Sequence, residues 1–396
     1  MISLKYEKLL SFLTLAGIVF FGMGLLLFPL DTSKSCVNGI NLCINAVFPS
    51  LFPFFVTSSM LISTGAISRL ADILAPIGRA LFGISGKGFS AFLIGISGGY
   101  PVGVRTAVQL FEEGHISKSE CQRLLLFCNN SGPAFMLGVV GVGLLGESRL
   151  GVILYTAHIL SAVIIGILLH KLSPEQFDLP TPQTVQKDKV NRAQFGFVTS
   201  FISSVTGAMG AMANVCGFVI FFGVFVTVLH KSGIINTISA LITAVFGDFL
   251  ADKGLLNGII TGFFELTGGI SALSGADLYS SVLTSGFLSG WAGLSVHFQA
   301  MSFMTRAGLK SRGYFIAKLF QGGLSSALLW LYFRLFPMSQ GAFSYDYPYY
   351  YGLDPEMYAG FLRGNLILTG FFMVLCLVLY FSIVFYQKIR YNKDND

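Results

Sequence analysis

Two short stretches combine glycine, proline and polar side chains inside apolar segments. The first is Ser97–Pro101, with the sequence SGGYP, and the second is Asn129–Pro133, with the sequence NNSGP. Because glycine allows positive φ and proline starts helical limbs, the first stretch predicts a hairpin tip whose free amides can bind a carboxylate. In the second, Pro133 frees backbone carbonyls that, with the side-chain amides, can hold substrate or sodium. A structural turn and ordinary interhelical hydrogen bonds are the respective alternatives.

Two charged residues accompany these stretches. Glu265 is the only acidic residue of the apolar segment Leu255–Leu273, and a carboxylate inside a membrane must be paired or protonated. It therefore suits a proton or cation carrier, or else reaches a nearby surface. Arg105 lies about one turn beyond the first tip, where its guanidinium can bind a carboxylate in bidentate fashion. The alternative for Arg105 is a loop residue that follows the positive-inside rule.

A histidine and a lysine lie in later apolar segments. His297 follows the glycine- and serine-rich stretch Gly286–Ser295 and can relay protons, unless it is a satisfied packing residue. Lys318 and Gln321 share one face of Gly313–Phe336. We expect Lys318 to extend its side chain to the membrane interface, so both residues stay outside the predicted site.

These residues form one candidate site with two kinds of role. The candidate substrate-binding residues are Ser97, Gly98, Gly99, Tyr100, Arg105, Asn129, Asn130, Ser131, Ser289, Gly290 and Gly293. The candidate ion-coupling residues are Glu265 and His297, with H⁺ or Na⁺ as the ion. No cofactor is expected, because the sequence contains no H-E-x-x-H motif, no G-x-x-x-x-G-K-[ST] motif and no Cys/His metal spacing. We therefore expect neither an enzyme nor an ATP-driven pump.

The composition requires a membrane. Of 396 residues, 54% are hydrophobic and only 11% are charged, against about 25% charged residues in soluble domains. Apolar runs recur that can each cross a hydrocarbon core about 30 Å thick; they include Leu9–Leu30, Leu150–His170, Gly313–Phe336 and Phe361–Tyr386. The net charge of +6 is explained by basic loops on the inner face, so no nucleic-acid partner is implied. The six cysteines fit buried small hydrophobes better than a disulfide or a reactive thiol.

A hydrophilic linker at 171–195 divides the chain into two similar halves. Each half has a spanning segment, a short amphipathic stretch, two glycine-broken apolar segments and an unbroken helix. In the first half these are Cys43–Thr64, Ile67–Leu81, Phe89–Leu110, Cys121–Leu145 and Leu150–His170. In the second they are Ala211–His230, Ile234–Phe246, Leu255–Leu273, Tyr279–Met304 and Gly313–Phe336. Paired broken segments at matching positions are typical of secondary transporters, with the site between them.

Loop charges give the orientation and the domain boundaries. With both termini cytoplasmic, and Phe89–Leu110 and Leu255–Leu273 as re-entrant hairpins, most Lys and Arg lie inside, whereas Lys34, Arg149, Lys231 and Lys253 lie outside. The first half then enters from outside and the second from inside, which predicts inverted repeats. The expected units are a helix and loop at 1–41, repeats at 42–170 and 196–336 around the linker, an exterior loop at 337–360, and a helix with a basic tail at 361–396.

Several stretches together resemble a known family. They are Val47–Phe55, Ile96–Arg105, Leu124–Phe135, Gly262–Gly269 and Gly286–Phe303. The sequence resembles the YlbJ-type sporulation integral membrane proteins, whose repeated module is the nucleoside-recognition Gate domain. That module is also found in concentrative nucleoside transporters and in the membrane part of FeoB-type iron transporters. The resemblance implies an all-α membrane fold of two inverted repeats with re-entrant hairpins and broken helices.

The resemblance also implies a function. In nucleoside transporters the tips and unwound helices hold substrate; Phe264–Leu266 resembles their second tip and Gly286–Ser295 their helix break. The first tip, Ser97–Pro101, departs from the nucleoside-binding form because it lacks Gln or Glu. For YlbJ-type proteins the implied role is movement of dipicolinate, a small organic anion, across a forespore membrane of a bacterium. A nucleoside transporter and a non-transporting membrane scaffold in spore maturation remain the alternatives.

Overall fold

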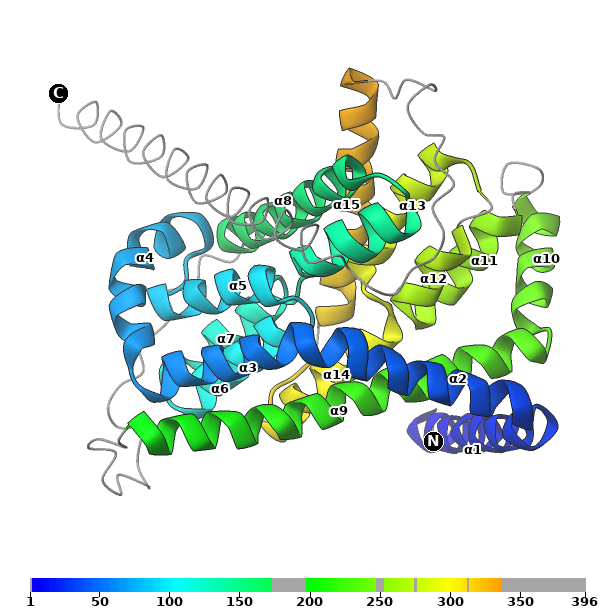
Figure 1. Ribbon diagram of the computed structural model, residues 1–396, viewed down its shortest axis with the longest axis horizontal. Coiled ribbons are helices and arrows are strands. Elements are labelled where there is room, and N and C mark those ends of the chain that lie inside the picture. Colours follow the sequence, from blue (N-terminus) through cyan, green and yellow to red (C-terminus); the bar gives the residue numbers. More distant parts are fainter. Residues whose placement is uncertain (1, 173–196, 247–252, 274–275, 312, 337–396) are drawn as a thin grey trace.

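The computed structural model describes residues 2–172, 197–246, 253–273, 276–311 and 313–336. These residues form helices joined by short connections, and none of them lies in a β-strand (Figure 1). The expected all-α class is therefore confirmed. The predictions for most of the linker, for the loop at 337–360 and for the C-terminal helix and its tail fall outside the described residues.

The N-terminal segment differs from the expectation of one helix followed by a loop to residue 41. Helix α1 (Ile2–Leu27) ends before a bend of 100°, and α2 (Pro29–Leu42) begins with a proline at its first turn. Proline is tolerated there because its missing N–H would be unpaired anyway. A π-helical turn, η1 (Cys43–Val47), leads on to α3 (Phe48–Ser63). The predicted loop is wrong because the polar α2 packs along α9, and such packing stabilises a helix that its own sequence would not.

Helix α9 (Phe197–Lys231) runs antiparallel to α2 and α3. Lys231, at its end, forms an ion pair of 2.8 Å with Asp31, near the start of α2. Further along, the Cys43 thiol lies 3.9 Å from the Cys216 carbonyl oxygen. Together α2, η1 and α3 therefore form an extended helical segment that lies beside the whole of α9 (Figure 1).

The first half continues with a hairpin and a broken helix. Its elements are α4 (Ala66–Phe82), α5 (Gly86–Gly98), α6 (Val102–Glu112), α7 (Lys118–Leu125), η2 (Ala134–Leu144) and α8 (Ser148–Leu172). The limbs α5 and α6 are antiparallel and almost touch: a Cβ added to Gly103 would lie 3.0 Å from Gly95 Cα and 2.0 Å from the Cys128 carbonyl oxygen. Only glycine fits there. The break between α7 and η2 contains the predicted stretch Asn129–Pro133.

The second half repeats this order. Its remaining elements are α10 (Ile234–Phe246), α11 (Lys253–Phe264), α12 (Leu266–Ala272), α13 (Leu278–Trp291), α14 (Gly293–Arg306) and α15 (Tyr314–Leu335). Helices α11 and α12 form the second hairpin, whose limbs approach so closely that a Cβ on Gly269 would lie 2.1 Å from Gly262 Cα. Helices α13 and α14 form the second broken helix. Both hairpins and both breaks predicted from the sequence are present; the inversion of the repeats stays a prediction.

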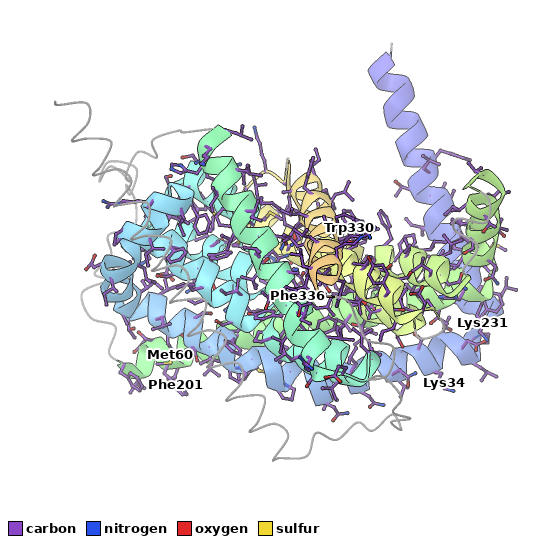
Figure 2. The ribbon with its side chains drawn as sticks, turned by 90° about the horizontal axis from the view of Figure 1, so that it is seen from above. Lys34, Met60, Phe201, Lys231, Trp330 and Phe336 are labelled. Atoms are coloured by element: carbon purple, nitrogen blue, oxygen red, sulfur yellow. The ribbon has the colours of Figure 1, made fainter. Side chains whose placement is uncertain are left out.

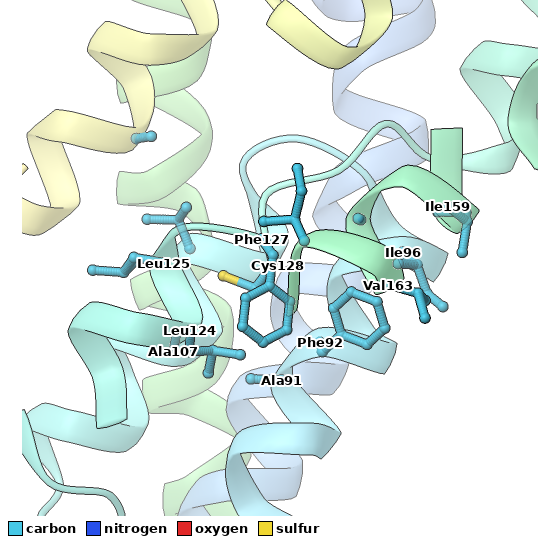
Figure 3. Packing of buried hydrophobic residues seen from close by; sticks show 14 of the residues in the cluster. Ala91, Phe92, Ile96, Ala107, Leu124, Leu125, Phe127, Cys128, Ile159 and Val163 are labelled. Carbon is cyan, nitrogen blue, oxygen red and sulfur yellow. The ribbon is translucent and has the colours of Figure 1, made fainter. Parts of the chain in front are cut away.

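The buried core surrounds the first hairpin and the first break. Phe82, Phe89, Phe92 and Phe127 pack against one another with ring centroids 5.1–6.1 Å apart. Figure 3 shows Phe92 and Phe127 side by side, next to Cys128. The core therefore fixes the backbone at the point where α7 ends and the extended break begins.

Large apolar side chains also cover the outside of several helices. Two helices, α8 and α9, are long and apolar enough to cross a membrane, and the count rises to four if each of two bent helix pairs is one span. Exposed residues such as Phe12, Phe201 and Leu331 suit contact with lipid. The protein is an integral membrane protein with apolar helices. Helix α15 does not reach the same apolarity, because Lys318 and Gln321 interrupt it.

Candidate functional site

Lys318 is buried, and no carboxylate of the described residues forms an ion pair with it. Its side chain is fully buried, and its Nζ donates hydrogen bonds of 2.6 Å to the Asn129 carbonyl oxygen and 2.5 Å to Gln321 Oε1. The ammonium also lies 5.5 Å from the centre of the Tyr100 ring. The ion pairs of His115 with Glu113 and of Lys231 with Asp31 do not involve Lys318. Lys318 is thus a buried amine held by neutral groups, and its charged form costs free energy unless a counter-charge is supplied.

The expected extension of Lys318 to the membrane interface is wrong. Helix α15 packs along α8 and α13, and the face that carries Lys318, Gln321 and Ser325 points into this packing. All three side chains are fully buried. The side chain cannot reach the interface because its direction is set by the helix face, whatever its length.

Side chains of helix α15 form hydrogen bonds with the break of the first half, and we call this set of bonds the clasp. Asn129 Nδ2 donates a 2.6 Å hydrogen bond to Tyr314 Oη, and Gln321 Nε2 donates a 2.8 Å bond to Asn130 Oδ1. Both asparagines are fully buried. The non-helical backbone at 129–132 is therefore tolerated within the core because a helix of the second half supplies hydrogen-bond partners.

Helix α8 supports the same break from another side. The Ser131 N–H donates a 3.0 Å hydrogen bond to His158 Nε2, and Tyr155 Oη donates a 2.8 Å bond to the Ile96 carbonyl oxygen near the first tip. Because Nε2 accepts a hydrogen bond, His158 is neutral with its proton on Nδ1. The break and the tip are thus held by one helix face.

The first tip meets both breaks. Gly99 has φ of 84°, and it approaches the break so closely that an added Cβ would lie 2.9 Å from Gly132 N. The Tyr100–Pro101 peptide bond is cis, and Tyr100 Oη donates a hydrogen bond to the Ser289 carbonyl oxygen of α13. Of the remaining tip residues, Ser97 donates to its own helix at the Leu93 carbonyl oxygen (2.9 Å).

The glycines of the second break serve close packing. Gly293, with φ of 78°, would place an added Cβ 3.1 Å from the Gly262 carbonyl oxygen and from Leu266 N, at the second tip. Gly290 faces Gly322 of α15, where an added Cβ would lie 2.4 Å from Cα. The structure therefore brings the two tips and the two breaks into one contiguous region, with the second break next to the second tip.

His297 lies in an aromatic surrounding near this region. Its ring is 4.4 Å from Trp291, 5.3 Å from Tyr314 and 4.9 Å from Phe315, measured between centroids. The side chain is fully buried, and neither ring nitrogen has a hydrogen-bond partner among the described residues. It is therefore a polar group that packing alone leaves unsatisfied.

Further buried polar atoms around Lys318 share this property. In the described part of the chain, the fully buried atoms without a hydrogen-bond partner include Asn129 Oδ1, Ser131 Oγ, His158 Nδ1, Ser285 Oγ, Ser289 Oγ and Ser325 Oγ. Buried polar atoms are paired in the great majority of folded proteins. These atoms lie at the first break and on α8, α13 and α15, and each can bond a polar ligand or water that reaches it.

The amino-acid sequence is similar to that of known proteins. Residues 45–213 match the protein family described as Gate, nucleoside recognition. The chain is also 26% identical over 381 residues to the sporulation integral membrane protein YlbJ of Bacillus subtilis (strain 168), covering 91% of this chain and 92% of that protein. The expected resemblance is confirmed. No solved structure matches. The Gate match covers the first half and the start of α9, so for the second half the likeness rests on YlbJ.

Arg105 lies apart from the Lys318 cluster. Its Nη1 donates a 3.1 Å hydrogen bond to the Phe55 carbonyl oxygen, and its guanidinium lies 4.7 Å from the centre of the Phe55 ring. The side chain therefore joins α6 to α3. Recognition of substrate by Arg105 stays a prediction, and the geometry favours Lys318 as the cation at the breaks.

Glu265 caps a helix. Its carboxylate accepts hydrogen bonds from Thr267 N (3.0 Å) and Gly268 N (2.6 Å) at the start of α12. This position satisfies the carboxylate with backbone amides and the helix dipole. Ion coupling by Glu265 or His297 stays a prediction.

Sequence reasoning missed part of the site. Lys318, Gln321, Tyr314 and His158 make most of its hydrogen bonds. A usable signal existed for His158, which lies near the middle of an unbroken apolar helix, where a polar residue needs a partner. For Lys318 and Gln321 the signal was their shared helix face, but both were left out of the predicted site because Lys318 was expected to reach the membrane interface.

Proposed function

We propose that this protein transports a small organic anion, which binds at the helix breaks beside Lys318. The observation that carries this proposal is the buried Lys318 amine, which has a carbonyl oxygen and an amide oxygen as partners and which becomes a cation when protonated. An anion supplies the missing counter-charge, whereas a metal cation would add repulsion and a neutral nucleoside would leave the charge unbalanced.

Helix ends at the breaks support an anionic ligand. Helices α6, η2 and α14 all begin at a tip or a break, and no side chain caps any of them. Their first N–H groups and dipoles favour negative charge. Helix α12 differs, because the Glu265 carboxylate already occupies its start. The region therefore offers a side-chain cation together with uncapped helix starts.

The arrangement of the halves supports transport by alternating access. Helices α3 and α9 occupy the same place in the order of the two halves, and they run antiparallel, as inverted repeats require. The bonds from Tyr314, Lys318 and Gln321 to the first break cross from one half to the other. Movement of one half against the other would break these bonds and open the site to one side.

The substrate proposed is dipicolinate, moved across a forespore membrane. YlbJ carries the description sporulation integral membrane protein, and the resemblance to its type is the reason for choosing this anion. A planar dicarboxylate can bind an ammonium through one carboxylate and helix-start amides through the other. H⁺ or Na⁺ is the proposed coupling ion, and both termini are proposed to be cytoplasmic.

Uptake of labelled dipicolinate into proteoliposomes tests the function. Lys318→Met should lower the initial rate by about tenfold or more, given about 1.5–3 kcal/mol for a hydrogen bond to a charged group. Lys310→Met, which removes an exposed lysine before α15, is the matched control and should transport like the wild type.

Two results would contradict the proposal. Normal uptake by the Lys318 variant, together with competition by a nucleoside, would favour the nucleoside alternative. Absence of uptake by the wild type for both solutes would favour the scaffold alternative.

A further inference from the structure

We propose that Lys318 is also the proton-binding group of the transport cycle, so that one proton is carried with each anion. This inference rests on the proposed function and assigns the coupling ion and its residue. Lys318 is fully buried and its Nζ is held by two neutral oxygens, at 2.5 Å and 2.6 Å. It lies at the junction of both halves, where a bound proton would move with the substrate.

The groups that face Lys318 leave its charge uncompensated. The titratable neighbours are Tyr314 on its own helix, Tyr100 at the first tip, Cys128 at the first break, His158 on α8 and His297 on α14. All of these are neutral in their usual forms near pH 7 except for a fraction of histidine, and His158 is held neutral by the bond from Ser131. No carboxylate of the described residues pairs with the ammonium.

Binding of the anion and of the proton are therefore linked. A buried charge without a counter-charge costs free energy, and an anion beside it removes most of that cost. By thermodynamic reciprocity, the bound anion favours the ammonium form, and the ammonium form favours the anion. The step is a proton transfer without redox change: the Nζ lone pair accepts a proton from water, and returns it to water after the anion leaves.

Three buried serine hydroxyls lie on α13 and α15, the helix that carries Lys318. Ser285 and Ser289 lie one turn apart on α13, and Ser325 lies one turn beyond Gln321 on α15. All three serines are fully buried, and none of their hydroxyls has a hydrogen-bond partner among the described residues. These hydroxyls thus have free donors and acceptors.

The two helices place these serines along one seam. A Cβ on Gly286 would lie 3.5 Å from Ser325 Oγ, and one on Gly290 would lie 2.4 Å from Gly322 Cα. The helices therefore run antiparallel, with Ser325 at a level between Ser285 and Ser289. Along α13 the two serines lie between the second break and the start of the helix, where Asp277 is exposed.

Equilibrium binding of labelled dipicolinate to the purified full chain tests the inference. Between about pH 7 and about pH 9 the carboxylates of the ligand stay ionised, and wild-type affinity should fall by up to about tenfold per pH unit where the empty amine is neutral. Lys318→Arg keeps its charge at every pH used, so its affinity should not change with pH. Lys310→Met should follow the wild type.

A second measurement reads the proton directly. Addition of dipicolinate to weakly buffered wild-type protein should take up close to one proton per bound anion at the alkaline end of the range, and Lys318→Arg should take up none. This comparison uses bound anion as its denominator, so a variant that folds only in part still gives an interpretable ratio.

The outcomes separate the inference from the function. Binding by the wild type with no pH dependence and no proton uptake would overturn the inference alone. So would a pH dependence that survives in Lys318→Arg but is lost in Glu265→Gln, which would assign the proton to Glu265. If the wild type binds no dipicolinate at any pH, the proposed function fails and the inference fails with it.

Discussion

Lys318 shows how a single side chain decides the chemistry of this site. Its type and spacing in an apolar helix could be read from the sequence, but its direction could not. A lysine at the fifth residue of a helix can either extend to the membrane interface or point into the protein. Which of these occurs depends on the face that packs against α8 and α13, and that is a property of the tertiary fold.

Other residue-scale predictions depended on local chemistry and did better. The glycines and prolines at 97–101 and 129–133 mark a tip and a break because their backbone preferences act locally. The sequence placed Arg105 beyond the first tip and Glu265 at the second tip. Their partners, Phe55 and the start of α12, could not be foreseen. The partners of a long side chain depend on which groups lie near it in the folded structure, and the sequence alone does not give this.

The cap at Glu265 gives a prediction at the residue scale. Glu265→Ala removes the acceptor for Thr267 N and Gly268 N, so it should lower the free energy of unfolding by about 0.5–2 kcal/mol. Glu265→Gln keeps an oxygen acceptor and should lose less. Chemical denaturation in detergent measures both; equal stability of Glu265→Ala and wild type would refute the capping role.

At the scale of elements, sequence pattern predicted the hairpins and the broken helices but not α2. Broken segments carry their own signal, because glycine and proline interrupt an apolar run. Helix α2 has no such signal: its residues are moderately polar, and α9 stabilises it by packing. The length of α9 was likewise underestimated, because the predicted segment began at Ala211 whereas the helix begins at Phe197, beside α3.

The close approach of α11 and α12 in the second hairpin predicts how a larger residue at Gly269 would change the stability. Gly269→Ala would place a methyl group 2.1 Å from Gly262 Cα, where only backbone surrounds it. Overpacking of this kind costs about 1–3 kcal/mol or more, so the melting temperature should fall clearly. Gly138→Ala, where nothing lies within 4 Å, is the control and should melt like the wild type. A Gly269 variant as stable as the control would contradict the tight hairpin.

At the scale of the whole molecule, loop charges and contacts agree about which ends lie together. The sequence puts Lys34 and Lys231 outside, and they lie at one end of the molecule, where Lys231 pairs with Asp31 (Figure 2). Met60 and Phe201, which border loops expected inside, lie together at the other end (Figure 2). Sidedness itself stays a prediction from the charge rule. The hydrogen bonds between the halves could not be predicted, because they join residues far apart in the chain.

Sidedness gives a prediction for the whole molecule. In a variant whose native cysteines are replaced, cysteine at Lys34 or Lys231 should react with a membrane-impermeant thiol reagent added outside intact cells. Cysteine at Lys118 or Lys171 should react only after the membrane is opened. The four positions test both halves, and labelling of Lys34 and Lys231 from opposite sides would contradict the antiparallel pairing of α2 with α9.

The clasp itself predicts coupling between the halves. Asn130 and Gln321 share a 2.8 Å hydrogen bond across the two halves, so the effects of Asn130→Ala and Gln321→Ala on stability should not add. The double variant should differ from the sum by about 0.5–1.5 kcal/mol. Simple additivity, measured by denaturation of the three variants, would show that the bond does not hold the halves together.

The position of a bound anion tests the central claim most directly. A cryo-electron microscopy structure of the protein with dipicolinate should show density for the ligand at the breaks. One carboxylate oxygen should lie about 2.7–2.9 Å from Lys318 Nζ, close to Asn129 and Ser131. Ligand density at Arg105, with Lys318 still bonded only to Asn129 and Gln321, would contradict the account.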